Sequence, residues 1–170
     1  PYGVTKLTLE MYAYFYGATH NLKYIIIRPS NVYGIGHRPF MGQGFISTAI
    51  ASAIKGIPVN IYGQYGTIRD YLYISDLVSG ILSVLNYGHL NEVYNIGSGS
   101  GLSNYEVLNN ISSILGKGVN EIQIKHLKSR PFDVKVNVLN TNKLTEHTGW
   151  SPKIVFSEGL LATYKWINTL

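Results

Sequence analysis

Two residues near the start of the chain have the types and spacing needed for proton transfer, Tyr2 and Lys6. On a helix, residues four apart lie on one face about one turn apart, and a neighbouring ammonium favours the phenolate form of a tyrosine. A phenol ready to lose its proton can serve as a general base. With 14 tyrosines and ten lysines among 170 residues, chance alone supplies about 0.8 such pairs, so the surroundings of this pair must decide its meaning.

Anion recognition is the second chemistry that the residue types suggest. The net charge is +5, but the basic residues are spread along the chain without a run that would form a nucleic-acid patch. We therefore expect anionic ligands rather than nucleic acid. Arginine suits phosphate because its planar fork donates in pairs, and the chain has only Arg28, Arg38, Arg69 and Arg130.

The elements around Tyr2 and Lys6 follow from apolar spacing. Apolar residues at three-to-four spacing predict a helix over 2–20, and the run 23–28 predicts a buried parallel strand closed by Pro29. The segment 30–44 holds four glycines and one proline, which is typical of a functional loop. We expect the ligand on this side of the sheet.

Helices and strands alternate over the rest of the chain, which favours an α/β fold. Helices are predicted at 45–55, 75–86, 104–115 and 157–167, the last three with Ser75, Asn104 and Ser157 as N-caps. Strands are predicted at 59–62, 70–73, 93–96, 122–125 and 136–138.

Composition excludes several classes of protein. A chain of 170 residues with 45% hydrophobic residues is long and apolar enough for one ordinary domain. The absence of cysteine excludes disulfides, zinc fingers and thiol nucleophiles. No apolar run approaches the ~20 residues of a membrane span, and no signal peptide is recognisable, so we expect a cytoplasmic protein without membrane contact. The five histidines lack metal-ligand spacing, and we predict no metal site.

Six ordered motifs place Tyr2 and Lys6 in a specific context. They are P-Y-G-V-T-K at 1–6, R-P-S-N-V-Y-G at 28–34, I-Y-G-Q-Y-G-T-I-R-D-Y at 61–71, Y-N-I-G-S-G at 94–99, R-P-F-D at 130–133 and G-W-S-P at 149–152. Together they resemble the extended short-chain dehydrogenase/reductase family, specifically the nucleotide-sugar epimerases and dehydratases of the UDP-glucose 4-epimerase type. The resemblance covers nearly the whole chain.

The resemblance implies a fold and a domain division. We expect the C-terminal part of a Rossmann-type parallel sheet plus a smaller mixed α/β substrate-binding domain. Residues 1–28 would be the last helix and strand of the dinucleotide-binding domain, and residues 29–170 the nucleotide-sugar domain. The family's glycine-rich fingerprint and its catalytic Ser or Thr have no counterpart here, and the cluster 97–101 lacks G-x-G-x-x-G spacing and is predicted to be a plain turn. We expect a C-terminal half that neither retains NAD nor is active alone.

The resemblance also assigns catalytic and cofactor roles. Tyr2 would take the proton of the sugar hydroxyl while hydride passes to NAD. Lys6 would bind the nicotinamide ribose and assist Tyr2 electrostatically. Pro29 would meet the nicotinamide carboxamide through its backbone carbonyl, although a proline that simply ends a strand is equally compatible with the sequence.

The substrate diphosphate would be bound by Asn31, Arg69 and Arg130. For Arg69 the alternative is a surface ion pair with Asp70 or Asp76, and for Arg130 too a structural role stays open. Nucleoside diphosphates suit this set because arginine forks bind phosphate oxygens.

The nucleotide would lie against Tyr62, with Asp133 accepting from its ribose or base, although an aromatic residue in a strand is ordinarily core packing. The backbone of Gln43, Gly44 and Phe45 would line the same site. Tyr65 and Phe132 are bulkier than the residues usual in the family and leave the base and sugar open.

The leading hypothesis is therefore that the chain is the substrate-binding part of an NAD-dependent epimerase. Its substrate would be a nucleoside-diphosphate sugar, a UDP-hexose, whose C4 is inverted through a keto-sugar intermediate. Two alternatives stay open, a 4,6-dehydratase, whose Asp-Glu pair would precede Pro1, and a non-catalytic sugar-nucleotide binding or oligomerisation module. A homo-oligomer is expected because Tyr12, Phe15 and Ile26 would be left uncovered.

Overall fold

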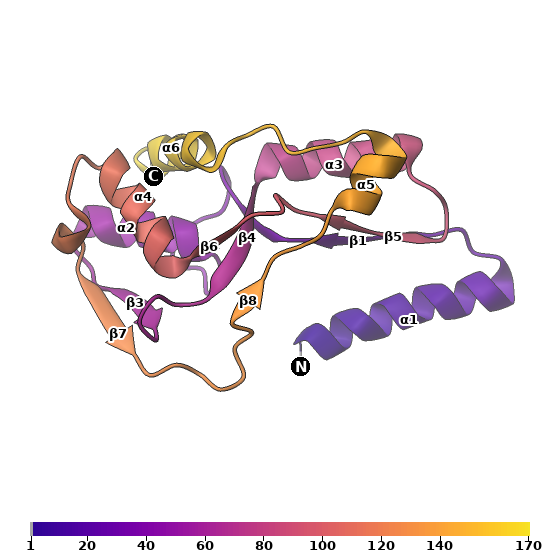
Figure 1. The fold of residues 1–170 in the computed structure, drawn as a ribbon, viewed down its shortest axis with the longest axis horizontal. Helices are drawn as coiled ribbons and strands as arrows, with labels where there is room; N and C mark the ends of the chain where they lie inside the picture. The colour runs from indigo at the N-terminus through magenta and orange to yellow at the C-terminus, as the bar shows by residue number, and fades with distance from the viewer. Residues whose placement is uncertain (1) are drawn as a thin grey trace.

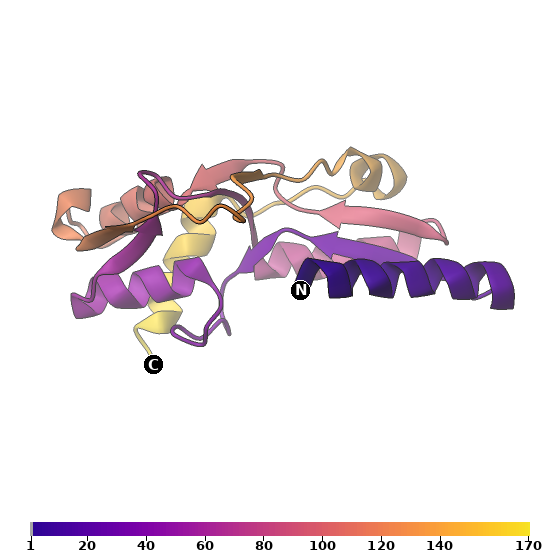
Figure 2. The same cartoon turned by 90° about the horizontal axis from the view of Figure 1, so that it is seen from below.

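A computed structural model describes residues 2–170 of the chain. Its N-terminal part is a helix–strand unit, α1 (Tyr2–His20) followed by β1 (Ile25–Pro29), and β1 pairs in parallel with the later strand β5 (Glu92–Ile96). Helix α1 lies along one face of this strand pair, and α3 (Ile74–Tyr87) and α5 (Asn142–Thr148) lie on the other (Figures 1 and 2).

The remaining strands form two further sheets at the other end of the molecule. Strand β4 (Ile68–Tyr73) pairs in parallel with β2 (Asn31–Tyr33) and β8 (Val136–Asn137) and antiparallel with β6 (Gly101–Ser103). Strand β3 (Val59–Tyr62) pairs in parallel with β7 (Ile124–Leu127). Helices α2 (Phe45–Lys55), α4 (Asn104–Ile114) and α6 (Phe156–Ile167) pack beside these strands, and the short 3₁₀ helix η1 (Val119–Glu121) precedes β7 (Figure 1).

The predicted α/β class with parallel strands is confirmed. The proposed division at residues 28 and 29 stays a prediction, and β5, far beyond that boundary, shares a sheet with β1.

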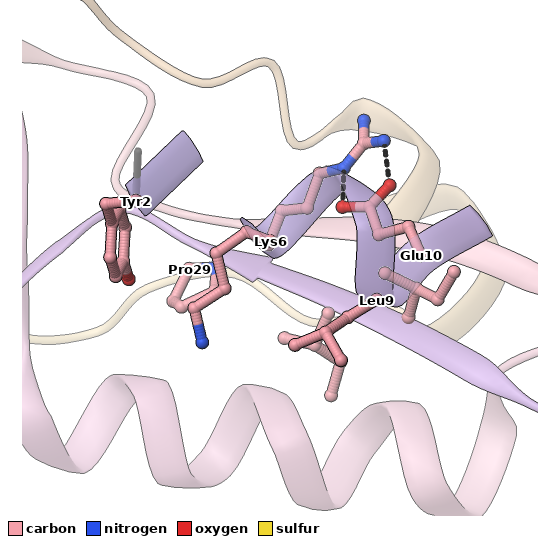
Figure 3. A pocket seen from close by; sticks show the side chains of 8 residues that line it. Tyr2, Lys6, Leu9, Glu10 and Pro29 are labelled. Carbon is pink, nitrogen blue, oxygen red and sulfur yellow. Dashed lines mark hydrogen bonds and ion pairs between the residues drawn. The ribbon is translucent and has the colours of Figure 1, made fainter. Parts of the chain in front are cut away.

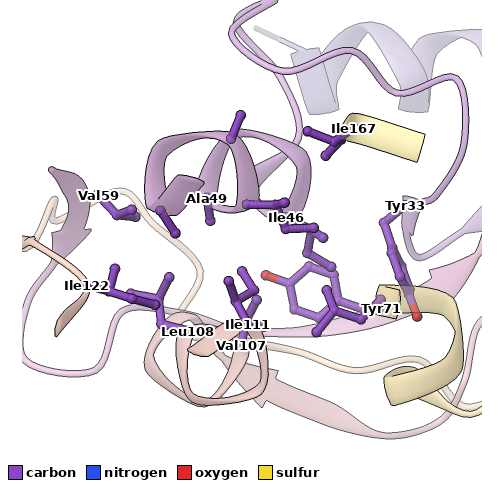
Figure 4. Packing of buried hydrophobic residues seen from close by; sticks show 14 of the residues in the cluster. Tyr33, Ile46, Ala49, Val59, Tyr71, Val107, Leu108, Ile111, Ile122 and Ile167 are labelled. Carbon is purple, nitrogen blue, oxygen red and sulfur yellow. The ribbon is translucent and has the colours of Figure 1, made fainter. Parts of the chain in front are cut away.

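Two apolar clusters hold the fold together. The larger lies among α2, α4 and α6, where Leu108 and Leu160 are fully buried (Figure 4). The smaller lies between β5, α3 and α5 and includes Tyr94 and Trp150. Apolar burial of this kind is the main favourable contribution to folding, so each half of the molecule has its own core.

Helix α1 is attached to the rest of the chain along one narrow face. None of its residues is buried, and its half-buried residues Glu10, Ala13, Tyr14 and Gly17 recur at helical spacing. The ring of Tyr14 packs edge-on against Tyr24, with the ring centroids 5.6 Å apart. A Cβ at Gly17 would lie 2.7 Å from the Tyr24 ring, so this position needs glycine for the helix to approach.

Most predicted elements are present with shifted ends, and the predicted caps are wrong. The N-caps are Tyr73, Ser103 and Val155 rather than Ser75, Asn104 and Ser157. At α4, the Ser103 hydroxyl accepts from the Glu106 N–H while the Glu106 carboxylate accepts from the Ser103 N–H, a capping box that Asn104 could not form. At α3, β4 runs directly into the helix, which leaves no room for a separate cap.

The predicted turn at 97–101 is a bend over residues 97–100, since Gly101 already begins β6, and it surrounds a buried carboxylate. Asp70 on β4 is fully buried. One of its oxygens accepts from the N–H and hydroxyl of Ser98 at 2.8 and 2.6 Å. The other accepts from the N–H groups of Gly99 and Leu139 at 3.1 and 3.3 Å. The turn is an anion-binding arrangement whose anion is supplied by the chain itself.

Candidate active site

Tyr2 and Lys6 lie on one face of α1, as their spacing predicts. The Lys6 ammonium is 5.6 Å from the centroid of the Tyr2 ring, and the Tyr2 side chain is 76% exposed. Both residues border a cavity of about 430 Å³ between α1 and β1, which Leu9, Glu10 and Pro29 help to line (Figure 3). The pair therefore faces a space that a ligand can enter beside the end of β1.

An ion pair between two of its lining residues borders this cavity. Arg28, the residue before Pro29, donates Nε and Nη2 to the two carboxylate oxygens of Glu10 at 2.9 and 2.5 Å (Figure 3). The hydrogen bonds from Arg28 hold the pKa of Glu10 below its usual range. Near neutral pH, Glu10 is thus a charged carboxylate that the Arg28 guanidinium binds in a bidentate way.

A second cavity, of about 750 Å³, begins where the first one ends. Tyr2 and Pro29 line both, and Asn31, Gln43 and Gly44 line the second. The predicted catalytic pair and the first predicted substrate residue therefore line two adjoining cavities.

The predicted nucleotide residues line two further cavities that continue this series. Gln43, Gly44, Phe45 and Tyr62 border one of about 610 Å³. Tyr62 also borders the next, of about 410 Å³, together with Arg130 and Asp133. Shared residues thus connect the space at Tyr2 to the space at Arg130 by four adjoining cavities.

The guanidinium of Arg130 is stacked on the Tyr62 ring, 4.1 Å from its centroid, and donates to Asp133 at 2.8 Å. Phe132 lies on the outside, 77% exposed and 5.5 Å from the same guanidinium. Tyr62 is half-buried and presents its ring to a cation rather than to the core. Tyr65, the other bulky departure from the family pattern, borders the 410 Å³ cavity.

Arg69 does not line the four cavities. Its Nη1 donates to the backbone carbonyls of Ile68 and Val134 at 2.8 and 2.7 Å. The alternative ion pair with Asp70 or Asp76 is wrong, because Asp70 is enclosed by the glycine turn and Asp76 accepts from the N–H groups of Lys153 and Ile154. Arg69 is held by backbone carbonyls instead.

Buried tyrosines near the site are unsuited to proton transfer. Burial raises the pKa of Tyr33, whose hydroxyl donates to the Phe156 carbonyl. Burial likewise raises the pKa of Tyr71 to about 12. These two stay neutral phenols near neutral pH.

Ser30 and His37, which the sequence did not single out as site residues, line the second cavity. Among residues 2–170, the Ser30 hydroxyl is buried without a hydrogen-bond partner. The His37 ring lies so close to Gly44 that a Cβ there would be 2.2 Å away, and Gly44 has φ 83°, which glycine adopts without strain. The position of Ser30 directly after Pro29 could have indicated from sequence that Ser30 lies at the site. The packing of His37 on Gly44 could not have been predicted from the sequence.

Residues 2–170 contain no cluster of three or more His, Cys, Asp or Glu side chains arranged for a metal ion. Within the same described residues, no helix is both long and apolar enough to span a membrane.

The mixed α/β architecture with parallel strands flanked by helices matches Rossmann-like epimerase and dehydratase structures. The family model of the NAD-dependent epimerase/dehydratase family matches residues 1–97, and the chain belongs to this family.

Its relatives include both reaction types. A dTDP-glucose 4,6-dehydratase of Xanthomonas campestris is 31% identical over 99% of this chain and 49% of its own length. A putative UDP-glucose 4-epimerase of Methanocaldococcus jannaschii is 30% identical over 99% of this chain and 53% of its own. The crystal structure of a UDP-glucose 4-epimerase from Thermotoga maritima with UDP-glucose superimposes with a TM-score of 0.91, at 31% identity, over 99% of this chain and 53% of that one. The chain therefore spans about half the length of these relatives.

Proposed function

We propose that this chain is the substrate-binding part of an NAD-dependent nucleotide-sugar epimerase that inverts C4 of a UDP-hexose. The observation that carries the proposal is the series of four adjoining cavities, with Tyr2 and Lys6 at one end and Arg130 with Tyr62 at the other. A nucleotide sugar has its groups in the matching order, with a reactive sugar at one end and an aromatic base at the other.

In this proposal each residue acts on a defined part of the ligand. Acting as a general base, the Tyr2 phenolate oxygen takes the proton from the sugar hydroxyl, and the Lys6 ammonium stabilises the negative charge of that phenolate before the transfer. Asn31 and Arg130 donate to the diphosphate. Arg69 lies outside the four cavities, so a role in diphosphate binding would require its Nη2 and Nε, which have no partner among the described residues, to reach the ligand from beside them. The ring of Tyr62 stacks on the base, and Asp133 accepts from the ribose or base.

The residues present fit one end of NAD. A phenol, an ammonium and Pro29 surround the cavity beside β1, which suits the nicotinamide and its ribose. The N–H groups of Ser98 and Gly99 in the glycine turn already donate to Asp70 and are not available to a pyrophosphate. NAD, when bound, supplies the hydride acceptor. We expect this chain alone to neither retain NAD nor turn over substrate, which mass analysis of the purified chain would check.

A 4,6-dehydratase is the second candidate, because the Xanthomonas relative of that activity aligns with 99% of the chain. Both candidates use the same diphosphate site, so the first experiment tests what they share. A non-catalytic sugar-nucleotide module would share it too.

Isothermal titration calorimetry with UDP and with dTDP tests the proposal. We expect one binding site, and Arg130→Ala should weaken it about 10- to 150-fold, the equivalent of about 1.5–3 kcal/mol for a lost charge-assisted bond. The same loss is expected for Arg69→Ala. Lys143→Ala, which removes an exposed cation away from the cavities, is the matched control and should leave affinity unchanged. Equal binding by the wild type and Arg130→Ala would contradict the assignment, and preference for dTDP over UDP would favour the dehydratase.

A further inference from the structure

The face of α1 that carries Tyr2 and Lys6 continues to Glu10. These three residues are spaced four apart, so each side chain neighbours the next along one row of the helix. Lys6 therefore has two neighbours of opposite character, the phenol of Tyr2 one turn before it and the carboxylate of Glu10 one turn after it.

An ammonium would be drawn to that carboxylate, because Lys–Glu pairs at this spacing attract each other on a helix. In the structure, the Lys6 ammonium lies instead over the Tyr2 ring, 5.6 Å from its centroid. Glu10 faces away from Lys6 and toward Arg28, which binds both of its oxygens (Figure 3). The side chain of Glu10 is 15% exposed, so the pair is largely withdrawn from water on the carboxylate side.

Two cations, Arg28 and Lys6, could each pair with the Glu10 carboxylate. In the structure Arg28 is the one that does so. We propose that Arg28 is a positioning residue: by occupying the Glu10 carboxylate, it leaves the Lys6 ammonium beside Tyr2. The inference rests on the proposed function, in which Lys6 supports the Tyr2 oxygen.

The fold explains why Arg28 can do this. It is on β1, directly before Pro29, and so it approaches α1 from the strand on which the helix lies. The guanidinium fork matches both carboxylate oxygens at once, which a single ammonium cannot do. The same ion pair joins the helix that carries Tyr2 to the strand that carries Pro29.

Nuclear magnetic resonance of the 170-residue chain, with lysine labelled at Cε, tests the proposal without NAD or nucleotide. Protons near the face of an aromatic ring resonate at lower frequency, so the Lys6 ε-methylene signal reports its position over Tyr2. Lys6→Arg identifies the signal, and Tyr2→Leu gives its frequency without the ring. We expect a clear difference between the wild type and Tyr2→Leu.

Arg28→Met should release Glu10, draw Lys6 toward it and remove most of that difference. Adding Glu10→Gln to Arg28→Met should restore the difference, because the competing carboxylate is gone. Arg28→Lys, which keeps the cation, should retain it at least in part. Lys143→Met, which breaks the exposed pair with Glu92, is the matched control and should change nothing.

A merely structural role for Arg28 predicts another pattern, in which the double variant is as altered as Arg28→Met. That result would overturn the proposal, as would an Arg28→Met signal equal to the wild type or a wild type equal to Tyr2→Leu. The proposal would also be overturned if Arg28→Lys lost the shift of the Lys6 signal as completely as Arg28→Met. Failure of the proposed function would appear separately, as absent nucleoside diphosphate binding in calorimetry.

Discussion

Asp70 makes a sharp test of the way the structure holds its glycine turn. Its two oxygens receive four hydrogen bonds, two from Ser98 and one each from Gly99 and Leu139. Asp70→Asn preserves the shape of the side chain but replaces one oxygen by an NH₂ group. If the NH₂ group takes the place of the oxygen facing Gly99 and Leu139, it confronts two N–H donors, and if it takes the other place it confronts the Ser98 N–H.

Either orientation loses one or two bonds to a charged acceptor and leaves buried donors unpaired. At about 1.5–3 kcal/mol for each such bond, we expect the free energy of unfolding to fall by about 3 kcal/mol. With a urea m-value of about 2 kcal/mol per molar, the unfolding midpoint should move down by about 1.5 M.

Asp76→Asn is the matched control for this measurement. Asp76 is also buried, but its two bonds, from the N–H groups of Lys153 and Ile154, end on the same oxygen. The amide oxygen of asparagine can take that place, so we expect a loss of only about 1 kcal/mol. Equal losses at the two positions, measured by urea unfolding, would refute the reasoning from the four bonds of Asp70.

Three further predictions follow from other parts of the molecule. Because Arg28 lowers the pKa of Glu10, the pair should stabilise the fold above the usual carboxyl pKa and lose that effect as pH falls through the lowered value. Glu10→Gln should therefore cost about 0.5 kcal/mol at pH 7 and nothing at pH 2.5, by urea unfolding at both pH values; an equal cost at both would contradict the ionic origin. Leu160→Ala, in the fully buried centre of the larger core, should cost about 2–5 kcal/mol by thermal or urea unfolding, and a cost below 1 kcal/mol would show that the site is not packed as described. Tyr12 and Phe15 are both more than half exposed on α1, so the chain should self-associate, and Phe15→Glu should shift its mass by light scattering toward the monomer; a wild-type monomer at high concentration would argue against it.

Local sequence pattern was sufficient to place both ends of three elements. The ends of α1, α2 and β3 agree with their predicted ranges, because apolar periodicity and the flanking Gly56 and Pro58 mark them locally. The helix α5 was missed because its seven residues are mostly polar and only Leu144 is buried. Strand β6 was missed because it has three residues, one a glycine, and exists through pairing with β4.

The candidate site was predictable where its residues lie close in sequence or match a family motif. Tyr2 with Lys6, and Arg130 with Asp133, are of this kind. The hydrogen bond of Arg69 to Val134 joins residues 65 apart, and the pairing of Arg28 with Glu10 joins a helix to a strand. The unpartnered hydroxyl of Ser30 depends on surroundings that only the folded chain creates. Such contacts follow from the topology and not from any local pattern.

Strand β4 couples the two apolar cores, because it contributes a residue to each of them. Its adjacent residues Tyr71 and Leu72 point to opposite faces, and one belongs to the larger core while the other belongs to the smaller. Losing either core would therefore remove one face of the same strand. We infer that the two cores unfold as one cooperative unit. Because β4 belongs to both, local opening of one core destabilises the folded state of the other.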